Sequence, residues 1–258
     1  MNGWRGYWIP FRGIVMRECL RFLQQRERFL AALVRPLMWL FVFAAGFRAA
    51  LGVSIIPPYE TYITYETYIV PGLMGMVQLF NGMQSSLSLI VDRELGSMRI
   101  LLLAPAPRWF LLFSKLLAGA VVSVLQVYLF LFIAWLTDIR LPLLGYLAVL
   151  PALIISGVML GSLGMLLSSA IRQLENFAGI MNFVIFPLFF LSSALYPIWK
   201  IGEASPLLEQ VCRLNPFTYV VEFIRFSLYL EVDKLSVAVV GVSLVLFLAL
   251  AVWRFQRT

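Results

Sequence analysis

Histidine is absent from this sequence of 258 residues, and lysine and cysteine are rare. Without histidine, general-base catalysis by imidazole, most zinc and haem sites and imidazole proton relays are excluded. None of the three lysines follows a glycine, so the phosphate-binding pattern G-x-x-x-x-G-K-[ST] does not occur. The chain is therefore not expected to hydrolyse ATP through that motif.

Charge is scarce as well, at 13% of the residues against roughly 25% in an average soluble domain. Hydrophobic residues make up 62% of the chain, and its mean hydropathy is +0.91. A water-soluble surface cannot be built from this composition. The sequence therefore predicts an integral membrane protein.

Six segments are predicted to span the membrane, because each approaches the length of about 20 apolar residues that a spanning helix needs. They lie at about 31–52, 67–91, 110–137, 143–170, 176–197 and 235–254. In the first segment Arg35 and Arg48 flank a short apolar core, and we expect them to extend toward opposite interfaces. No carboxylate lies deep in any span, which argues against a transporter coupled to ions through a buried acid.

Basic residues are unevenly divided between the two sides that six spans define. The termini and alternate loops hold 14 of the 20 basic residues and 5 of the 13 acidic ones, so the positive-inside rule places both termini in the cytoplasm. Segment 7–30 has an apolar and a basic helical face and is predicted to be an interfacial amphipathic helix, not a cleavable signal peptide. The predicted fold is all-α, with six transmembrane helices after this helix. Cys19 and Cys212 then lie on opposite sides, which excludes a disulfide framework.

Polar residues form a stripe along one face of the second predicted span, at spacings of 3, 4 and 3. They are Gln78, Asn81, Ser85 and Ser88. In lipid such groups must face protein or water, so they either hydrogen-bond neighbouring helices or line a substrate path. Asn182 in the fifth span, beside Phe183 and Phe186, presents the same two alternatives, and Pro187 is expected to kink that helix.

Two connecting segments are more than linkers. Segment 92–108 is dense in charge yet contains an apolar turn and two prolines, which predicts a short helix packed at the inner face. Segment 197–233 holds three prolines between apolar stretches, which predicts amphipathic pieces entering the outer leaflet.

Motifs in these segments resemble, in order and spacing, those of the membrane subunit of type-2 ABC exporters. The resemblance rests on Pro71-Gly72-Leu73, on Asp-Arg-Glu-Leu-Gly-Ser-Met-Arg at 92–99, on Ala-Pro-Ala-Pro-Arg at 104–108, on Leu-Tyr-Pro-Ile at 195–198 and on Asn-Pro-Phe-Thr-Tyr at 215–219. It covers essentially the whole chain. Ser97 replaces the more usual threonine, which is a minor departure.

The resemblance implies a permease that works as a pair of copies, in lipid, with two copies of a separate ATP-binding subunit. ATP and Mg²⁺ would bind to that partner, so this chain is expected to be a non-catalytic subunit with no cofactor, metal or nucleic acid of its own. Segment 92–108 would be the coupling helix, and its contacts with the ATPase would come from Arg93, Glu94, Gly96, Arg99, Pro105 and Arg108. The second and fifth helices would line the path, and segment 197–233 would close the exit, with Tyr196, Pro197, Asn215 and Pro216 as gate candidates.

Two features of the sequence bear on the transported substrate: the branch of the family that the motifs resemble, and the residues that line the predicted path. Polysaccharide exporters of this family commonly carry a Phe-Pro-Arg type loop where this sequence has Arg-Glu-x-Gly, so the chain resembles the drug and glycolipid branch more closely. An apolar, aromatic lining favours an amphiphilic or lipid-like substrate, exported across a bacterial-type inner (plasma) membrane. The alternatives are a stand-alone ion-coupled or passive transporter and a non-transporting membrane scaffold or enzyme subunit.

Overall fold

A computed structural model describes residues 3–24, 33–43, 57–59, 63–94, 107–171 and 174–257. Within these ranges every element is helical. The elements are α1 (Gly3–Gln24), the π-helical turn η1 (Trp39–Phe43), α4 (Tyr65–Glu94), α6 (Arg108–Leu136), α7 (Leu143–Ala170), α8 (Leu174–Phe190), α9 (Ile198–Ala204), α10 (Pro206–Leu214), α11 (Pro216–Leu228) and α12 (Lys234–Arg257). The prediction of an all-α protein is thus confirmed for the described residues.

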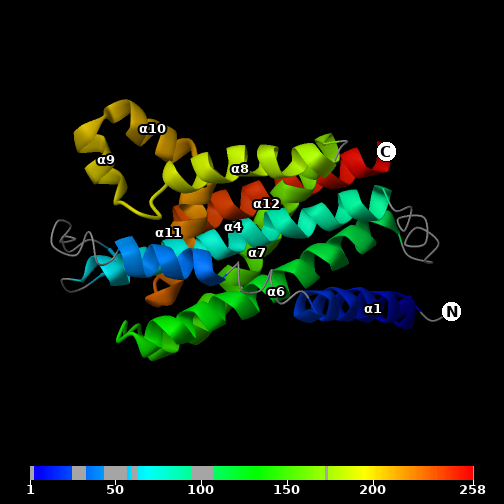
Figure 1. Ribbon diagram of the computed structural model, residues 1–258, viewed down its shortest axis with the longest axis horizontal. Helices are drawn as coiled ribbons and strands as arrows, with labels where there is room; N and C mark the ends of the chain where they lie inside the picture. The colour runs from blue at the N-terminus through cyan, green and yellow to red at the C-terminus, as the bar shows by residue number, and fades with distance from the viewer. Residues whose placement is uncertain are drawn as a thin grey trace.

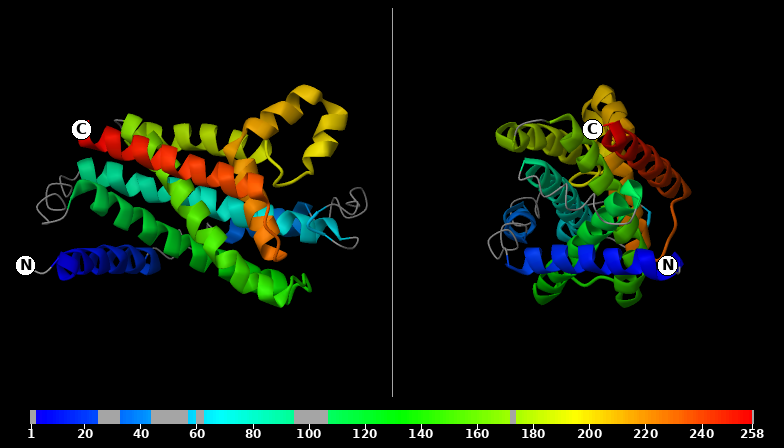
Figure 2. Two further views of the ribbon diagram at one scale, coloured as in Figure 1. Left: turned by 180° about the vertical axis from the view of Figure 1, so that it is seen from behind. Right: turned by 90° about the vertical axis from the view of Figure 1, so that its right-hand side faces the viewer.

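The long helices form one elongated bundle (Figure 1). Both chain termini lie at one end of the bundle, beside the end of α4 and the start of α6, whereas α9 and α10 project from the opposite end. Figure 2 shows the same arrangement from behind, with α1 beside α6 at the end of the termini. The last residues of α4 and the first residues of α6 therefore lie at the opposite end of the molecule from α9 and α10.

Helix α4 is the central element. Every residue from Tyr68 to Met83 is buried, and the helix packs against α6, α7, α8, α11 and η1. Its buried side chains belong to the main hydrophobic cluster, together with residues of α7 and α11. Any polar group on this stretch of α4 must consequently find its partner within the protein.

Glycines allow α4 and α7 to approach closely. A Cβ atom on Gly82 would lie 2.9 Å from the backbone nitrogen of Gly161, and one on Gly164 would lie 2.7 Å from the carbonyl oxygen of Gly82. Both distances are too short for a side chain, so only glycine fits at this crossing. Gly161 and Gly164 of α7 therefore serve helix packing, as small residues commonly do where membrane helices cross.

Three helices in the described ranges are long and apolar enough to cross a membrane: Trp109–Leu136, Leu143–Ser169 and Lys234–Arg254. Leu33–Val42 and Gly179–Phe190 are apolar but shorter, and α4 is long but more polar. In the most apolar stretch of the last of these helices only 17% of the residues are buried, although α12 packs against α7 and α11. Six spans and a cytoplasmic location of both termini remain predictions, and much of segment 31–52 lies outside the described residues.

Candidate functional site

The polar stripe of α4 makes hydrogen bonds to two neighbouring helices. Gln78 is fully buried; its Nε2 donates to the carbonyl oxygen of Leu153 in α7 at 3.1 Å, and its Oε1 accepts from the Ser123 hydroxyl in α6 at 2.6 Å. Gln78 thus joins three helices. Its contacts are those of the helix-packing alternative, and lining of a path stays a prediction for this residue.

Asn81, one turn further along α4, contacts a second buried amide. Its Nδ2 donates to Oε1 of Gln126 in α6, and both side chains are buried. The hydroxyl of half-buried Ser85 donates to the carbonyl oxygen of Gly82 within the same helix, at 2.9 Å. The side chain of Ser88 lies outside the described atoms. Asn81 of the stripe therefore faces α6, which the spacing of the polar residues alone could not show.

Replacing Asn81 with leucine is expected to lower the free energy of unfolding by about 1 kcal/mol, because the buried Oε1 of Gln126 would lose its donor. The double variant Asn81→Leu/Gln126→Leu should recover most of that loss, since neither amide is then left unpaired. Equilibrium unfolding of the purified protein in mixed micelles measures both changes. Equal stability of wild type and the single variant would contradict a structural role for this pair.

Helix α8 presents one face to the core and the opposite face outward. Phe189 is buried, whereas Phe183 is 80% exposed and Phe186 is 42% exposed. Asn182 also lies on the exposed side. Asn182, Phe183 and Phe186, predicted from the fifth span, are therefore accessible in this structure, unlike Gln78 and Asn81. Pro187 lies within the same helix.

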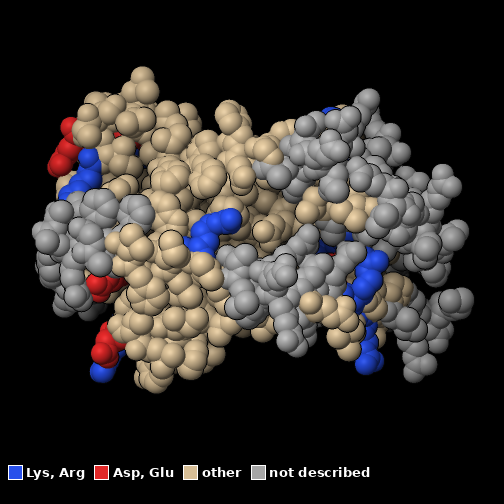
Figure 3. All heavy atoms as spheres, in the orientation of Figure 1, with Lys and Arg blue, Asp and Glu red and all other residues tan. Residues whose placement is uncertain are grey.

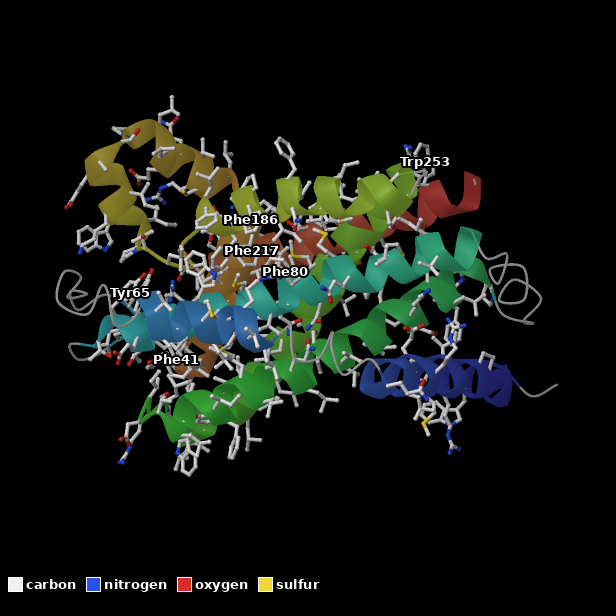
Figure 4. All side chains as sticks on the ribbon, in the orientation of Figure 1. Phe41, Tyr65, Phe80, Phe186, Phe217 and Trp253 are labelled. Atoms are coloured by element: carbon white, nitrogen blue, oxygen red, sulfur yellow. The ribbon has the colours of Figure 1, made fainter. Side chains whose placement is uncertain are left out.

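An aromatic cluster joins this face of α8 to α4 and to the Leu33–Val42 helix (Figure 4). The rings of Phe80 and Phe186 pack edge to face with centroids 6.5 Å apart, and those of Phe186 and Phe190 stack at 6.1 Å. Trp39 contacts Phe190 at 5.5 Å. The cluster holds three separate segments together at one surface.

Arg35 lies on this cluster. Its guanidinium carbon is 3.7 Å from the centroid of the Phe80 ring, and the residue is half-buried. Phe80 occupies the middle of α4, about 20 Å from either end of that helix at 1.5 Å per residue. The Arg35 charge thus lies over the middle of α4, whereas its extension toward an interface of the membrane stays a prediction. In the sequence, Arg35 stands out because it is a charged residue inside a predicted span.

A second polar cluster lies at the opposite end from the termini. Arg225 of α11 is buried, pairs with Glu222, and donates from Nη2 to the carbonyl oxygen of Ser193 at 2.9 Å. The Tyr68 hydroxyl donates to the same oxygen at 3.1 Å, and the Arg225 guanidinium carbon lies 4.3 Å from the Tyr68 ring centroid. Arg225 thus ties α11 to α4 and to the turn after α8.

In this cluster the side chain of Arg225 is charged and the nearby phenol of Tyr59 is neutral. Desolvation lowers the pKa of Arg225, but the opposing effect of Glu222 and the neighbouring tyrosines is larger, so the pKa is raised overall. Burial raises the pKa of Tyr59, which lies against this cluster. Arg225 is therefore charged, and the Tyr59 phenol neutral, across physiological pH.

The predicted gate residues organise the adjoining turn. Asn215 accepts a hydrogen bond from the backbone nitrogen of Phe217 at 2.9 Å, so it caps α11, and Pro216 follows as the first residue of the helix. The Asn215 amide also donates to the carbonyl oxygens of Leu188 and Leu191, at 2.7 and 2.6 Å. The Asn-Pro pair therefore fastens the start of α11 to the end of α8.

Of the two remaining gate residues, Pro197 borders a cavity of about 220 Å³ that Glu222 and Arg225 also line. Pro197 begins α9, and Tyr196 precedes it, half-buried. The cavity is lined by Pro57, Tyr68, Pro197, Ile198, Trp199, Arg213, Glu222 and Arg225. Three helices, α9, α10 and α11, occupy the segment for which the sequence predicts amphipathic pieces.

The predicted coupling residues are only partly described. Arg93 and Glu94 end α4 and Arg108 begins α6, while their side chains lie outside the described atoms. Gly96, Arg99 and Pro105 fall in the undescribed stretch 95–106. The two helix ends lie together at the end of the bundle that carries both termini (Figure 1).

The fold and these polar clusters define a helical integral membrane protein with several apolar spans. The sequence profile of the ABC-2 type transporter family matches residues 10–229. The chain belongs to this family, whose members are membrane transport components. Its functional class is thereby a transport permease.

Curated relatives agree with this assignment. The chain is 31% identical over 213 residues to a protein named transport permease ycf38 in Cyanophora paradoxa, covering 80% of this chain and 70% of that one. It is 28% identical to the ycf38 protein of Porphyra purpurea, covering 83% and 72%. It is 27% identical to a protein named multidrug ABC transporter permease YbhR in Escherichia coli K12, covering 69% of this chain but only 48% of the relative.

Proposed function

We propose that this chain is the permease subunit of an ATP-driven exporter that moves an amphiphilic or lipid-like substrate outward by alternating access. Two copies would pair, and two copies of a separate ATP-binding subunit would bind at the end that carries the termini. The observation that carries the choice of substrate is the outward face of α8, where Asn182, Phe183 and Phe186 lie exposed beside the aromatic cluster. Such a face accepts an apolar chain entering from the bilayer.

The family and one relative's name support the energy source and cargo class. ABC-2 permeases act with ATP-binding partners, and the name of the Escherichia coli relative includes multidrug transport. The segment between α4 and α6 would transmit the movement of the partner, through Arg93, Glu94, Gly96, Arg99, Pro105 and Arg108. At the other end, Tyr196, Pro197, Asn215 and Pro216 would control the exit.

A stand-alone ion-coupled transporter is the second candidate. Such proteins usually hold an ionisable group deep in a span for the coupling ion. None of the 13 acidic residues lies in the middle of a predicted span, so this candidate has no carboxylate to use. The sequence therefore favours an external energy source.

Co-purification from native membrane through a tag on this chain tests the proposal. Recovery of an ATP-binding subunit at one-to-one stoichiometry, with ATP-dependent flux of a fluorescent amphiphile in proteoliposomes, is the expected result. A homo-oligomer without such a partner would favour the stand-alone candidate. Stimulation of ATP hydrolysis by hydrophilic oligosaccharides alone would overturn the amphiphilic substrate.

Glu94→Ala tests the coupling segment. Without this carboxylate we expect amphiphile-stimulated ATP hydrolysis and export to separate, with export falling at least about 10-fold, because one lost charge-assisted contact is worth roughly 1.5–3 kcal/mol. Expression and assembly should be unchanged. Glu231→Ala, in the exposed turn after α11, is the matched control. Normally coupled export by the Glu94 variant would remove this residue from the coupling role.

A further inference from the structure

Arg35 carries a charge into the middle of the bundle. It lies on the ring of Phe80, at the midpoint of the 30-residue helix α4, and not near either helix end. In Figure 4, Phe80 lies between Tyr65 near one end of the bundle and Trp253 near the other. A charge at this depth in a bilayer is energetically unfavourable and marks a functional position by default.

The surroundings of Arg35 are apolar and accessible. On its own helix Met38, Phe41 and Val42 are exposed, and across the aromatic cluster Phe183 and Phe186 are exposed as well. On this face of the molecule the acidic side chains gather mainly at the end of α9 and α10 (Figure 3). Among the described residues, no carboxylate forms an ion pair with Arg35.

A second copy of the chain could not neutralise this charge at the same depth. The 13 acidic residues all lie outside the predicted spans or at their ends, and a second copy brings the same set. On α8, the helix that shares the aromatic cluster, the acidic residue is Glu175, about 16 Å from Phe186 along the helix axis. The predicted spans therefore supply no carboxylate at the level of Arg35, which leaves a bound anion as the partner to test.

The guanidinium is arranged to receive an anion. The guanidinium carbon lies 3.7 Å from the centroid of the Phe80 ring, a cation–π contact that needs none of the five N–H donors. Those donors match the oxygens of a carboxylate, phosphate or sulfate in pairs. The exposed rings of Phe183 and Phe186 offer an apolar surface for the rest of such a molecule.

We propose that Arg35 binds the anionic group of an amphiphile at mid-depth, while the apolar chain of that amphiphile packs against Phe183 and Phe186. This inference rests on the proposed function and makes it narrower: among amphiphiles, the permease selects those with a carboxylate, phosphate or sulfate. The anion belongs either to a transported amphiphile or to a resident anionic lipid.

The test measures binding of matched amphiphiles to the complex of permease and ATP-binding subunit in phosphatidylcholine nanodiscs. An alkyl phosphate, an alkyl glycoside and an alkyl trimethylammonium of the same chain length compete with a brominated-chain probe that quenches tryptophan fluorescence. Arg35→Gln should weaken the affinity for the alkyl phosphate at least about 10-fold, because a charge-assisted contact is lost. The affinity for the alkyl glycoside should stay within about 2-fold of the wild-type value. Arg35→Lys should bind the phosphate more weakly than wild type but more tightly than Arg35→Gln, because the charge remains while the paired donors are lost.

The controls separate this inference from the proposed function. Arg140→Gln, at an exposed ion pair beyond the end of α6, should change none of the affinities. Unchanged alkyl phosphate binding by Arg35→Gln, or equal weakening of all three probes, would overturn the anion site. Binding does not require ATP, so wild-type ATP hydrolysis that ignores every amphiphile would contradict the proposed export and leave the anion site standing. Competition by added phosphatidylglycerol would support the site and identify a resident lipid as its ligand.

Discussion

Arg225→Met is expected to destabilise the protein by about 3–5 kcal/mol, the loss measured when one partner of a buried ion pair is removed. The variant leaves Glu222 without its counter-charge and the Ser193 carbonyl oxygen without one of its two donors. It also breaks the link between α11, α4 and the turn after α8. Equilibrium unfolding in mixed micelles measures the change.

Two further variants make this prediction specific. Arg140→Met removes an ion pair whose side chains are 83% and 90% exposed, and should change stability by no more than about 0.5 kcal/mol. Arg225→Met/Glu222→Gln removes the orphaned charge and should recover part of the loss. Wild-type stability of Arg225→Met would show that the cluster at this end of the bundle does not hold the fold.

Gly72→Ala should lower stability by about 2–3 kcal/mol, near the upper end of the usual range for overpacking. A Cβ atom on Gly72 would overlap the carbonyl oxygen of Ala194, and backbone atoms cannot move aside as a side chain can. We therefore expect α4 to separate from the turn after α8. A lower unfolding temperature and a reduced yield of monodisperse protein are the measurements.

Gly241→Ala provides the matched control, because a Cβ at that position of α12 would meet nothing within 4 Å. Alanine favours a helix over glycine by about 1 kcal/mol, so this variant should be neutral or slightly stabilising. If both variants behaved alike, helix propensity and not the close contact at Ala194 would explain the result. Gly72 belongs to the Pro-Gly-Leu motif, so the outcome also bears on why that motif contains glycine.

Hydropathy made much of this fold predictable. Helices α6, α7 and α12 each contain a long charge-free run, and such runs specify apolar helices without reference to any partner. The cap of α11 was also visible, since Asn215 followed by Pro216 is typical of a helix start. These features depend on neighbouring residues in the chain, which a single sequence shows directly.

Features that depend on contacts between distant segments were not predictable in this way. The spacing placed Gln78 and Asn81 on one face of a helix but could not indicate that α6 and α7 cover that face. For Arg225, the sequence shows Glu222 three residues away, whereas Ser193 becomes its neighbour only through the fold. Likewise the depth of Arg35 depends on Phe80, which lies 45 residues further along the chain.

The polarity of α4 has a consequence for how the protein is made. Helix α4 is not among the described helices that are apolar enough to cross a membrane. Its amides at Gln78 and Asn81 find their partners on α6 and α7, which are synthesised later. Stable insertion of α4 must therefore wait until those two helices have entered the membrane, and until then the segment depends on the translocation machinery.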